Sequence, residues 1–565
     1  MKASDKTLFS FLKDLRGQLT IPIYQRDYSW SEKQYQRFWE DLNQLNLEVE
    51  RSEHFLGTIV SKSQEMRNEL ELPEISLIDG QQRITCISLL FASICAFCKN
   101  NKIKDFNWQE KIYNSVLLNR IGEGDKKYRL TLQKIDDETL KMIIDDLPGI
   151  INTKSPSIST NIAKTYNFFY KNLNHQNYLD IFYKSLKFKI FDGQAEEHDD
   201  AQIIFDSLNT TGSPLKSFEQ IRNYTLMDYD YKTQQELYYK YWSVMMDYFK
   251  NKSNKFDDFT EIFKKYRIGK LTQGGKVYDY IKQVVRNGTD KKDILKELFI
   301  FYKKFIAIQE YETGIDEVDK TLKFILKISG SELPPIILKI YDAYLNKTCS
   351  EKEFISCIHY LDAFICRHKV MGNSLSFILR NSFKNLNEID ETNCFKSIQK
   401  LSEKHEINDS QFIQGLKTFE PYTMKKSFCK IFLERIENNF HKKGRISLNK
   451  YSVEHIMPKT LSEDWKNQLG NNYQQIHYMY CESLGNLTLT AYNSEMSNDT
   501  FEEKLNMENG FKDDRLHLNK SVAKYNHWNE DTILKRLDYL SNLCLDIWKY
   551  PELNITEIYK QDILR

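Results

Sequence analysis

The spacing of apolar residues predicts a mixed α/β start to this chain. Short apolar runs at residues 21–24, 55–60 and 75–78 indicate extended segments or strands. Between the first two runs, Ser31 and Gln34 form a capping-box pattern, and apolar residues follow it at helical spacing. The first part of the chain is therefore expected to alternate strands with helices.

The rest of the chain is patterned mainly for helices. A long apolar helix is predicted over residues 82–98, and helix follows helix from 216 to 440. Short turn-rich segments then surround residues 453–458 and 484–497. We expect an α+β fold that is predominantly helical. The expected domains are an α/β domain, a helical connector or sensing region, and a C-terminal domain with flanking helices, at residues 1–228, 229–443 and 444–565.

Composition supports a globular, helical protein. Hydrophobic residues make up 41% and charged residues 28% of the 565 positions, which is ordinary for a folded protein. Only 10 prolines and 20 glycines occur, so few residues break helices. The 80 Lys and Arg balance the 79 Asp and Glu, which argues against a polybasic surface but leaves room for a local basic groove. The basic stretch at residues 264–267 is interpreted as a solvated face, with phosphate-backbone contact as the alternative.

Neither a membrane span nor a disulfide framework is expected. The most apolar run, residues 85–98, is shorter than the roughly 18 residues that a span requires. The 10 cysteines are scattered, and the close pair Cys95 and Cys98 has no second pair to complete a zinc site. Cys366 and His368 also lack a partner pair. Reduced core thiols and a cytoplasmic location are the expectation.

A first polar cluster stands between a strand and a helix start. Residues 75–78 lead into Asp79 and Gly80, and the helix begins near Gln82. The positive end of a helix, with its free N–H groups, suits a phosphate. Gly80 allows close backbone approach, Arg83 can clamp phosphate oxygens, and Asp79 can hold a metal or polarise water. Local chemistry alone favours a plain turn with a solvated helix start, because the Gly-Lys-Ser/Thr phosphate loop is missing from the sequence.

A second polar cluster lies near the end of the chain. Glu454 and His455 stand side by side on a short apolar strand, and adjacent strand residues face opposite sides. A histidine can deprotonate water, a Mg²⁺ or Mn²⁺ ion can stabilise a scissile phosphate, and an asparagine can orient the histidine ring. This chemistry fits phosphodiester hydrolysis, with a structural histidine as the alternative. Three asparagines and a lysine follow, at Asn486, Asn493, Asn498 and Lys504.

Five motifs follow one another in the first part of the chain. They are Tyr24-Gln25-Arg26-x-Tyr28-x-Trp30, Phe55-Leu56-Gly57, Asp79-Gly80-Gln81-Gln82-Arg83-x-Thr85, Phe205-x-x-Leu208-Asn209-x-x-Gly212-x-x-Leu215 and Ile221-Arg222-Asn223. Their order resembles the GmrS-type domain, the nucleotide-hydrolysing half of modification-dependent (type IV) restriction systems, which also occurs in SspE and BrxU. The resemblance implies a fold similar to ParB and sulfiredoxin.

This resemblance also implies a site for a nucleoside triphosphate. Asp79 and Arg83 would take part in its hydrolysis. The implied nucleotide contacts are Gln25, Arg26, Asp79, Gly80, Gln81, Gln82, Arg83, Thr85, Asn209 and Gly212.

The motifs of the second cluster are Val453-Glu454-His455-Ile456-x-Pro458, Leu484-Gly485-Asn486-Leu487-Thr488-Leu489, Asn493 and Ser497-Asn498-x-x-Phe501-x-x-Lys504. They resemble the GmrD-type nuclease domain, a member of the HNH (ββα-metal, His-Me finger) nucleases. By this resemblance His455 is the general base and Asn486 the central asparagine. Glu454 and Asn493 stand on the metal side, and Asn498 and Lys504 contact DNA phosphate. Whether Asn493 or Asn498 touches the metal stays open.

Together the two resemblances imply an anti-phage restriction enzyme. It would be an NTP-dependent, Mg²⁺- or Mn²⁺-dependent endonuclease that cuts or nicks modified or phage double-stranded DNA, with the middle helices as connector, homodimer surface or sensing surface. The alternatives are an SspE-like phosphorothioate-stimulated NTPase that nicks DNA, a nucleotide-switched DNA-binding scaffold without cleavage, and an RNA-directed toxin.

Overall fold

The computed structural model of the protein consists of two compact units. Unit 1 comprises Met1–Lys252 and Ile281–Lys296, and unit 2 comprises Ser253–Tyr280 and Glu297–Arg565. The predicted fold class, α+β and predominantly helical, is confirmed. The residues that the structure describes are 2–15, 17–45, 54–63, 72–119, 121–195, 216–227, 229–250, 253–271, 274–441 and 447–552.

A six-stranded mixed sheet organises unit 1. Its strands are β1 (Lys2–Thr7), β2 (Gln18–Thr20), β3 (His54–Ser63), β4 (Glu74–Asp79), β5 (Leu130–Thr131) and β6 (Phe188–Ala195). Their order across the sheet is β1-β6-β3-β4-β2-β5. β3 pairs antiparallel with β4 and parallel with β6, and β2 runs parallel to both β4 and β5. β4 is therefore an inner strand, with a neighbour on each side.

The first apolar run forms its strand earlier than the pattern predicts. The extended segment expected at residues 21–24 is replaced by β2, which ends at Thr20. The chain turns after it, and the Gln25 N–H donates to the Pro22 carbonyl at 3.0 Å. Proline has no N–H to donate to a neighbouring strand, so the ladder does not continue through it. The strands predicted at residues 55–60 and 75–78 are confirmed as β3 and β4.

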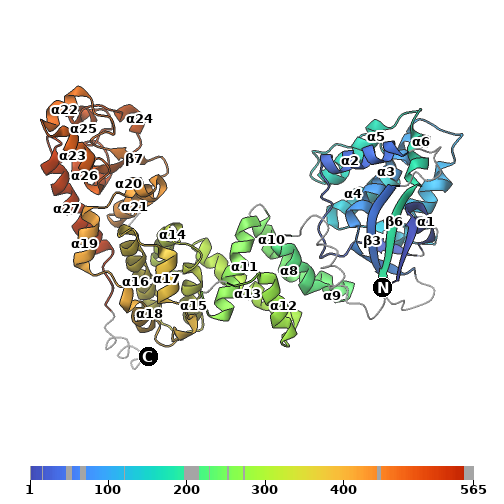
Figure 1. The fold of residues 1–565 in the computed structure, drawn as a ribbon, viewed down its shortest axis with the longest axis horizontal. Coiled ribbons are helices and arrows are strands. Elements are labelled where there is room, and N and C mark those ends of the chain that lie inside the picture. The colour runs from blue at the N-terminus through green and yellow to red at the C-terminus, as the bar shows by residue number, and fades with distance from the viewer. Residues whose placement is uncertain are drawn as a thin grey trace. The chain divides into compact units, whose positions relative to one another are not determined.

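Helices flank the sheet of unit 1, as α2, α3, α5 and α6 do in Figure 1. The helices of this unit are α1 (Leu8–Asp14), α2 (Glu32–Gln44), α3 (Gln81–Asn100), η1 (Gln109–Leu117), η2 (Gly124–Lys127), α4 (Lys134–Asp146), α5 (Thr160–Asn172), α6 (Tyr178–Ser185), α8 (Ser217–Leu226), α9 (Tyr231–Leu237), η3 (Tyr238–Trp242) and α10 (Ser243–Phe249). The capping box of Ser31 and Gln34 is formed and starts α2 as predicted. α3 packs against α5 and η1 and runs through the centre of the core.

By length and composition, α3 is apolar enough to cross a membrane, although the apolar run seen in the sequence is shorter. Its most apolar window has a mean hydropathy of 1.3, but 89% of that window is buried inside the protein. The side chains around it belong to the largest core cluster of unit 1. This burial identifies α3 as a core helix.

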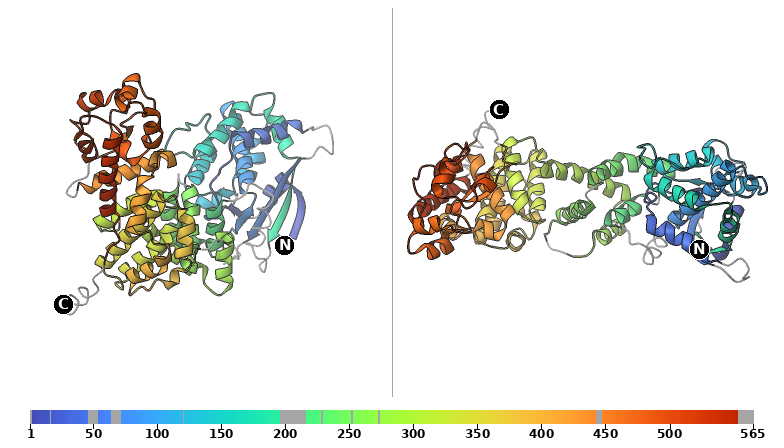
Figure 2. Two further views of the ribbon diagram at one scale, coloured as in Figure 1. Left: turned by 60° about the vertical axis from the view of Figure 1, so that its left-hand side comes forward. Right: turned by 90° about the horizontal axis from the view of Figure 1, so that it is seen from above.

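Unit 2 is built almost wholly of helices, which Figure 2 shows from two further directions. α12 (Val277–Arg286) and α13 (Lys291–Gln309) run across the division between the units. The other helices before the C-terminal hairpin are α11 (Ser253–Ile268), α14 (Asp316–Ile328), α15 (Leu333–Leu345), α16 (Glu351–Val370), α17 (Leu375–Ser382), η4 (Leu386–Glu388), α18 (Cys394–Ser402), η5 (Glu403–His405), α19 (Asp409–Lys417), α20 (Pro421–Met424) and α21 (Lys426–Asn439). The long predicted helical stretch is confirmed.

A two-stranded hairpin forms the centre of the last part of unit 2. β7 (Ser452–His455) pairs antiparallel with β8 (Leu487–Thr490), so that Glu454 faces Thr488 and His455 faces Leu487 across the ladder. A compact core around Trp465 and Trp528 lies beneath it. The elements that surround the hairpin are α22 (Glu463–Leu469), α23 (Tyr473–Tyr480), η6 (Leu484–Asn486), α24 (Asn493–Met496), α25 (Phe501–Asn506), α26 (His517–Val522) and α27 (Glu530–Ile547).

All ten cysteines lie within the described residues, and each is free and buried. Burial raises the pKa of several of these thiols, for example that of Cys98 to about 12. The prediction of reduced core thiols is confirmed, and the cytoplasmic location stays a prediction.

Candidate functional site

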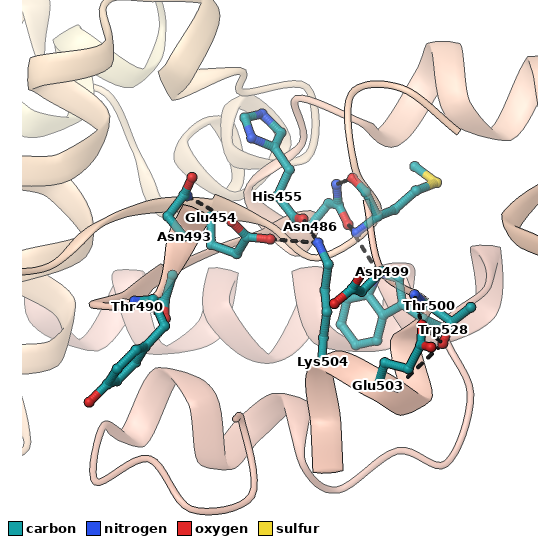
Figure 3. A network of polar contacts seen from close by, with 12 residues as sticks. Glu454, His455, Asn486, Thr490, Asn493, Asp499, Thr500, Glu503, Lys504 and Trp528 are labelled. Carbon is teal, nitrogen blue, oxygen red and sulfur yellow. Dashed lines mark hydrogen bonds and ion pairs between the residues drawn. The ribbon is translucent and has the colours of Figure 1, made fainter. Parts of the chain in front are cut away.

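The strand β7 delivers two polar side chains to opposite sides of the backbone. Glu454 is 4% exposed and His455 is 8% exposed. The His455 ring points away from the contact that Glu454 makes with Lys504 (Figure 3). This is the alternation that two successive residues of a strand must show, so the two side chains have different surroundings.

Glu454 belongs to a buried ion pair. Its Oε1 accepts from the Nζ of Lys504 at 2.6 Å, and its Oε2 accepts from the Nδ2 of Asn493 at 2.7 Å. Lys504 is fully buried and also donates to the His455 carbonyl at 3.1 Å. Burial raises the pKa of Glu454, and Lys504 opposes that shift. Its two oxygens are thus fixed by a cation on one side and an amide on the other.

His455 is held by a carboxylate on the residue Glu482. The His455 Nε2 lies 3.1 Å from the Glu482 Oε2, and the Lys459 Nζ lies 2.8 Å from the Glu482 Oε1. The Tyr422 ring meets the His455 ring edge-on, with 4.8 Å between the ring centres. Burial lowers the pKa of His455, and Glu482 opposes this shift. A lowered pKa keeps the imidazole neutral near pH 7, which is the state a general base needs.

Asn486 is fully buried and binds four groups around the hairpin. Its Oδ1 accepts from the Met457 N–H at 2.8 Å and from the indole N–H of Trp528 at 3.0 Å. Its Nδ2 donates to the carbonyls of Met457 and Cys481, both at 2.9 Å. These bonds tie the segment after β7 to the turn before β8. The amide therefore fixes the backbone, whereas the sequence suggested that an asparagine orients the histidine ring.

A polar pocket of about 250 Å³ opens beside β7. Residues that line it are Glu454, His455, Asn493, Asn498, Lys426 and Lys459. The pocket joins a carboxylate, an imidazole, two amides and two ammonium groups, and its lining excludes the buried Lys504. Hard oxygen ligands, positive charge and one imidazole thus line the same pocket, a combination that suits a phosphodiester.

The structure brings together most of the expected residues of this cluster and adds three. Glu454, His455, Asn493 and Asn498 line one pocket, as the resemblance implies. Lys504 and Asn486 are absent from the pocket lining. Lys504 binds Glu454 where a DNA phosphate was expected, and Asn486 binds backbone groups and Trp528 where the histidine ring was expected. The added residues are Lys426, Lys459 and Glu482. For two of these residues the sequence offered one signal, which is their position next to a motif. Lys459 follows Pro458 directly, and Glu482 stands just before the Leu484-Gly485-Asn486 motif.

The first polar cluster lies where β4 passes into α3. Gly80 caps the helix with φ 90°, a left-handed conformation that glycine adopts without strain. A Cβ at this position would stand 3.0 Å from the Cγ1 of Ile59 and 3.1 Å from the Thr58 carbonyl oxygen. The expected strand, turn and helix start are all present. The first N–H groups of α3 therefore begin directly at a tight turn, as an anion site requires.

Two glutamines of this cluster bind backbone groups. Gln25 is buried and donates to the carbonyls of Leu77 and Ile78 at 2.5 and 3.1 Å. Gln82 accepts from the Ser29 N–H at 2.8 Å and donates to the Asp27 carbonyl at 3.1 Å. Both side chains thus attach the segment around residues 24–30 to the end of β4 and the start of α3.

The remaining residues of the cluster differ in their surroundings. Arg83 donates to the Thr58 carbonyl at 3.0 Å and lies 3.8 Å from Asp79, and each of these two side chains is about one-third exposed. Thr85 is buried and donates to the Gln81 carbonyl within α3 at 2.9 Å. The Gln81 Oε1 is buried without a hydrogen-bond partner in the described part of the chain. Arg26, which follows Gln25 in the sequence, is half-buried. Asn209 and Gly212 lie outside the described residues.

Arg222 on α8 is buried. It belongs to the Ile221-Arg222-Asn223 motif, which predicted no role for it. Arg222 is 7% exposed, and its Nε and Nη2 find no hydrogen-bond partner among the residues the structure describes. Burial lowers its pKa, and Tyr238, Glu219 and Asp27 oppose that shift. Two unused guanidinium N–H groups in a buried place suit an anion.

Two family models match the chain. Residues 7–226 match the model described as GmrSD restriction endonuclease, N-terminal domain, and residues 406–543 match the model described as GmrSD restriction endonucleases, C-terminal domain. The chain belongs to the GmrSD restriction endonuclease family. The polar pocket at β7 lies within the C-terminal GmrSD match, and the junction of β4 and α3 lies within the N-terminal one. No curated protein matches the chain.

Membership in the GmrSD family establishes the general activity. The protein is a nuclease of the type IV restriction class, and its family implies that it binds DNA. Restriction endonucleases generally use a divalent metal.

Proposed function

We propose that this protein is an NTP-dependent DNA endonuclease that cuts or nicks modified or foreign DNA at the pocket beside β7. The observation that carries the proposal is the convergence of His455, Glu454 and Asn493 on one cavity of about 250 Å³ inside the C-terminal family match. The same cavity is lined by an imidazole whose pKa is lowered by burial and by the oxygen-bearing side chains of Glu454 and Asn493.

The donor atoms of the pocket fit a divalent cation. The Glu454 carboxylate and the Asn493 amide line the pocket, and carboxylate and amide oxygens are the ligands that Mg²⁺ and Mn²⁺ prefer. The Asn493 amide donates through its Nδ2 to Glu454 and to the Val453 carbonyl, so its oxygen is the atom left for a ligand. A bound ion supplies positive charge to the scissile phosphate and the leaving oxygen. We propose Glu454 and Asn493 as its ligands, with Asn498 on the phosphate side.

His455 is proposed to accept a proton from the attacking water. Its Nε2 faces the Glu482 carboxylate at 3.1 Å, which assigns the ring hydrogen to Nε2 and leaves Nδ1 as the proton acceptor. Glu482 thereby fixes the tautomer and holds the ring, and the edge-on Tyr422 limits its rotation. Cleavage transfers the proton of the water to Nδ1 as the water oxygen attacks phosphorus.

The positive charge at the pocket is proposed to bind the DNA backbone. Lys426 is exposed, and the Lys459 side chain is 50% exposed, so both ammonium groups reach solvent. Lys504 has no exposed surface and is paired with Glu454. We therefore propose Lys426, Lys459 and Asn498 as phosphate contacts, and Lys504 as the residue that stabilises Glu454.

The junction of β4 and α3 is proposed as the nucleoside triphosphate site. The N-terminus of a 20-residue helix begins there at Gly80, and Arg83 and Asp79 remain partly exposed beside it. The Gln82 side chain of this junction binds the Asp27 carbonyl, and the charge of Asp27 acts on Arg222, whose unused N–H groups add a buried positive charge. These features support phosphate binding by helix N–H groups and arginine. Asp79 and Arg83 are the proposed hydrolytic residues, with Gln25 and Gln82 holding the surrounding backbone.

The three sequence segments are proposed to divide the work. Residues 1–228 bind and hydrolyse the nucleotide, residues 229–443 connect or sense, and residues 444–565 cleave DNA. Nucleotide turnover in the first segment is proposed to control access to the pocket in the last.

One experiment tests this function. The purified protein is incubated with Mg²⁺ or Mn²⁺, each nucleoside triphosphate in turn, and plasmid or phage DNA of differing modification, including phosphorothioate. Released phosphate and strand breaks are measured together. We expect strand breaks that require both a metal and a nucleotide on at least one modified DNA. Strand breaks at the same rate without nucleotide would contradict the dependence, and no breaks on any DNA would contradict the cleavage.

A further inference from the structure

Three side chains of different chemistry converge behind the pocket. The ring nitrogens of His455, the thiol of Cys481 and the carboxylate of Glu482 offer ligand atoms that all lie within 4.8 Å of one another. Cys481 is 7% exposed, and Glu482 is half-buried. Nitrogen, sulfur and carboxylate oxygen in one place are the donor set that Zn²⁺ binds, whereas Mg²⁺ prefers oxygen alone.

We propose that His455, Cys481 and Glu482 form a zinc-binding site, separate from the oxygen ligands Glu454 and Asn493, and that Zn²⁺ bound there switches the nuclease off. The binding half of this proposal stands on the geometry of the three side chains. The inhibitory half rests on the proposed function of His455.

The backbone of this site is fixed before any metal arrives. Asn486 donates to the carbonyls of both Cys481 and Met457 at 2.9 Å, so one buried amide joins the Cys481 turn to the segment after His455. Lys459 binds the Glu482 Oε1 at 2.8 Å, which leaves Oε2 directed at the His455 ring. Ligands that are held in place lose little conformational freedom on binding a metal, and such partners raise metal affinity.

Zinc at this site would remove the proposed base by a simple exchange. Zn²⁺ binding would require a change of tautomer: the Nε2 hydrogen would leave to solvent and Nδ1 would take one up, so that the ring stays neutral. The freed Nε2 lone pair would bind the metal, the thiol proton of Cys481 would leave to solvent, and the Glu482 carboxylate would exchange its hydrogen bond to the ring for a bond to the metal. The single ring hydrogen would then stand on Nδ1. His455 therefore has no lone pair with which to accept a proton from water. Mg²⁺ lacks affinity for the thiolate, so the supporting metal does not cause this inhibition.

Binding is tested first, without reference to cleavage. The full-length protein is titrated with Co²⁺ as a spectroscopic substitute for Zn²⁺, because a cobalt–thiolate bond gives a charge-transfer band. The expected result is a band that saturates at one equivalent and is abolished by added Zn²⁺. Cys481→Ser should lose the band. Cys349→Ser should keep it, and it is the matched control because Cys349 is another buried thiol of unit 2, close to Cys394.

Folding of each variant is checked by its melting temperature. The Asn486 bond goes to the Cys481 carbonyl, so the serine variant retains it. If Cys481→Ser melts early, Glu482→Gln replaces it in the test: it should keep the thiolate band and weaken cobalt binding at least about tenfold, since one ligand is lost. A band of wild-type intensity and affinity in either variant would overturn the site.

Inhibition is tested second, by DNA cleavage in Mn²⁺ with increasing Zn²⁺. Wild-type cleavage should be inhibited at zinc concentrations at least about tenfold below those that inhibit Cys481→Ser. Equal inhibition of the two proteins would overturn the switch. A wild-type protein that shows the cobalt band but fails to cleave DNA with every metal tested would refute the proposed function and leave the zinc site standing. A wild-type protein that cleaves DNA but shows no cobalt band would refute the zinc site and leave the proposed function standing.

Discussion

At the scale of single residues, the site depends on two neighbours that point to opposite sides of one strand. Glu454 turns to the buried Lys504, whereas His455 turns to Glu482 at 3.1 Å. The sequence motif predicted both positions, because a carboxylate and an imidazole were already adjacent. It did not predict their partners, since Lys504 and Glu482 come from other elements, and only the folded chain sets which lysine is buried and which is exposed.

The first prediction contrasts two lysines: replacing Lys504 should affect stability, and replacing Lys426 should affect DNA binding. Lys504→Met should lower the free energy of unfolding by about 3–5 kcal/mol, because it leaves the buried Glu454 carboxylate without its cation. Lys426→Ala should leave stability unchanged, because the side chain is exposed. It should instead weaken DNA binding and reduce the salt dependence of binding by about one charge.

Urea unfolding and DNA binding at several salt concentrations measure the two effects. Lys466→Ala serves as the control, because Lys466 is on α22, pairs with Glu463 and is absent from the pocket lining. A Lys504→Met protein of normal stability with a reduced salt dependence would assign Lys504 to DNA after all.

At the scale of elements, regular periodicity was enough to predict most of the fold. The capping box of α2, the strands β3 and β4 and the core helix α3 are where the pattern places them. The basic stretch at residues 264–267 shows where pattern fails. Lys264 and Lys265 are 3% and 4% exposed, and Lys264 donates to the Gly274 and Gly275 carbonyls. These acceptors follow about ten residues later in the chain, so helical periodicity within α11 could not indicate them.

The helix α16 supplies a prediction about pH. Burial lowers the pKa of His368 from 6.5 to about 4, a hydrogen bond with the His405 backbone opposes this change, and the charge of His405 adds to it. The Phe364 ring and the Asn373 side chain also contact the His368 ring. The unfolded chain therefore takes up a proton before the folded chain does. Stability should be full above pH 6.5 and fall as the pH drops toward about 4.

The expected loss in the free energy of unfolding is at most about 3 kcal/mol. It arises because the pKa of His368 is lower in the folded chain than in the unfolded chain. Each tenfold difference in proton affinity is worth about 1.4 kcal/mol. The loss is measured as the change in urea midpoint between about pH 7.5 and about pH 4.5. His368→Gln should make the curve flatter. His359→Gln should not, because His359 lies on the same helix, is 34% exposed and pairs with Glu317. A curve of unchanged slope in His368→Gln would show that other groups cause the acid sensitivity.

At the scale of the whole molecule, the two candidate sites lie in separate units of one chain. The nucleotide candidates lie around Asp79 in unit 1, and the nuclease pocket lies around His455 in unit 2. The motifs predicted two separate sites because each motif was recognisable alone. They could not predict Arg222, whose significance comes from burial without a partner among the described residues, or the polar contacts of the pocket that depend on tertiary packing.

Coupling between the units is a prediction at this scale. Asp79→Ala should abolish nucleotide turnover and lower DNA cleavage with it, while the melting temperature of the protein stays unchanged, since the Asp79 side chain is about one-third exposed. Phosphate release and strand breaks are measured on the same sample. Asp125→Ala is the control, because Asp125 is an exposed aspartate of unit 1 away from the junction of β4 and α3. Full cleavage by an Asp79→Ala protein that no longer releases phosphate would show that the two activities are independent.

The central claim is that the imidazole of His455, the last residue of β7, acts as the general base in DNA cleavage. The most direct measurement is the rate of plasmid cleavage by His455→Ala under the conditions in which the wild-type protein cleaves, with His527→Ala as the control because His527 is exposed and lies outside the pocket lining. We predict that His455→Ala loses cleavage by at least about 10²-fold while it still melts normally, binds DNA and hydrolyses nucleotide, and that His527→Ala cleaves like the wild type. A folded His455→Ala protein that cleaves at the wild-type rate would contradict the account.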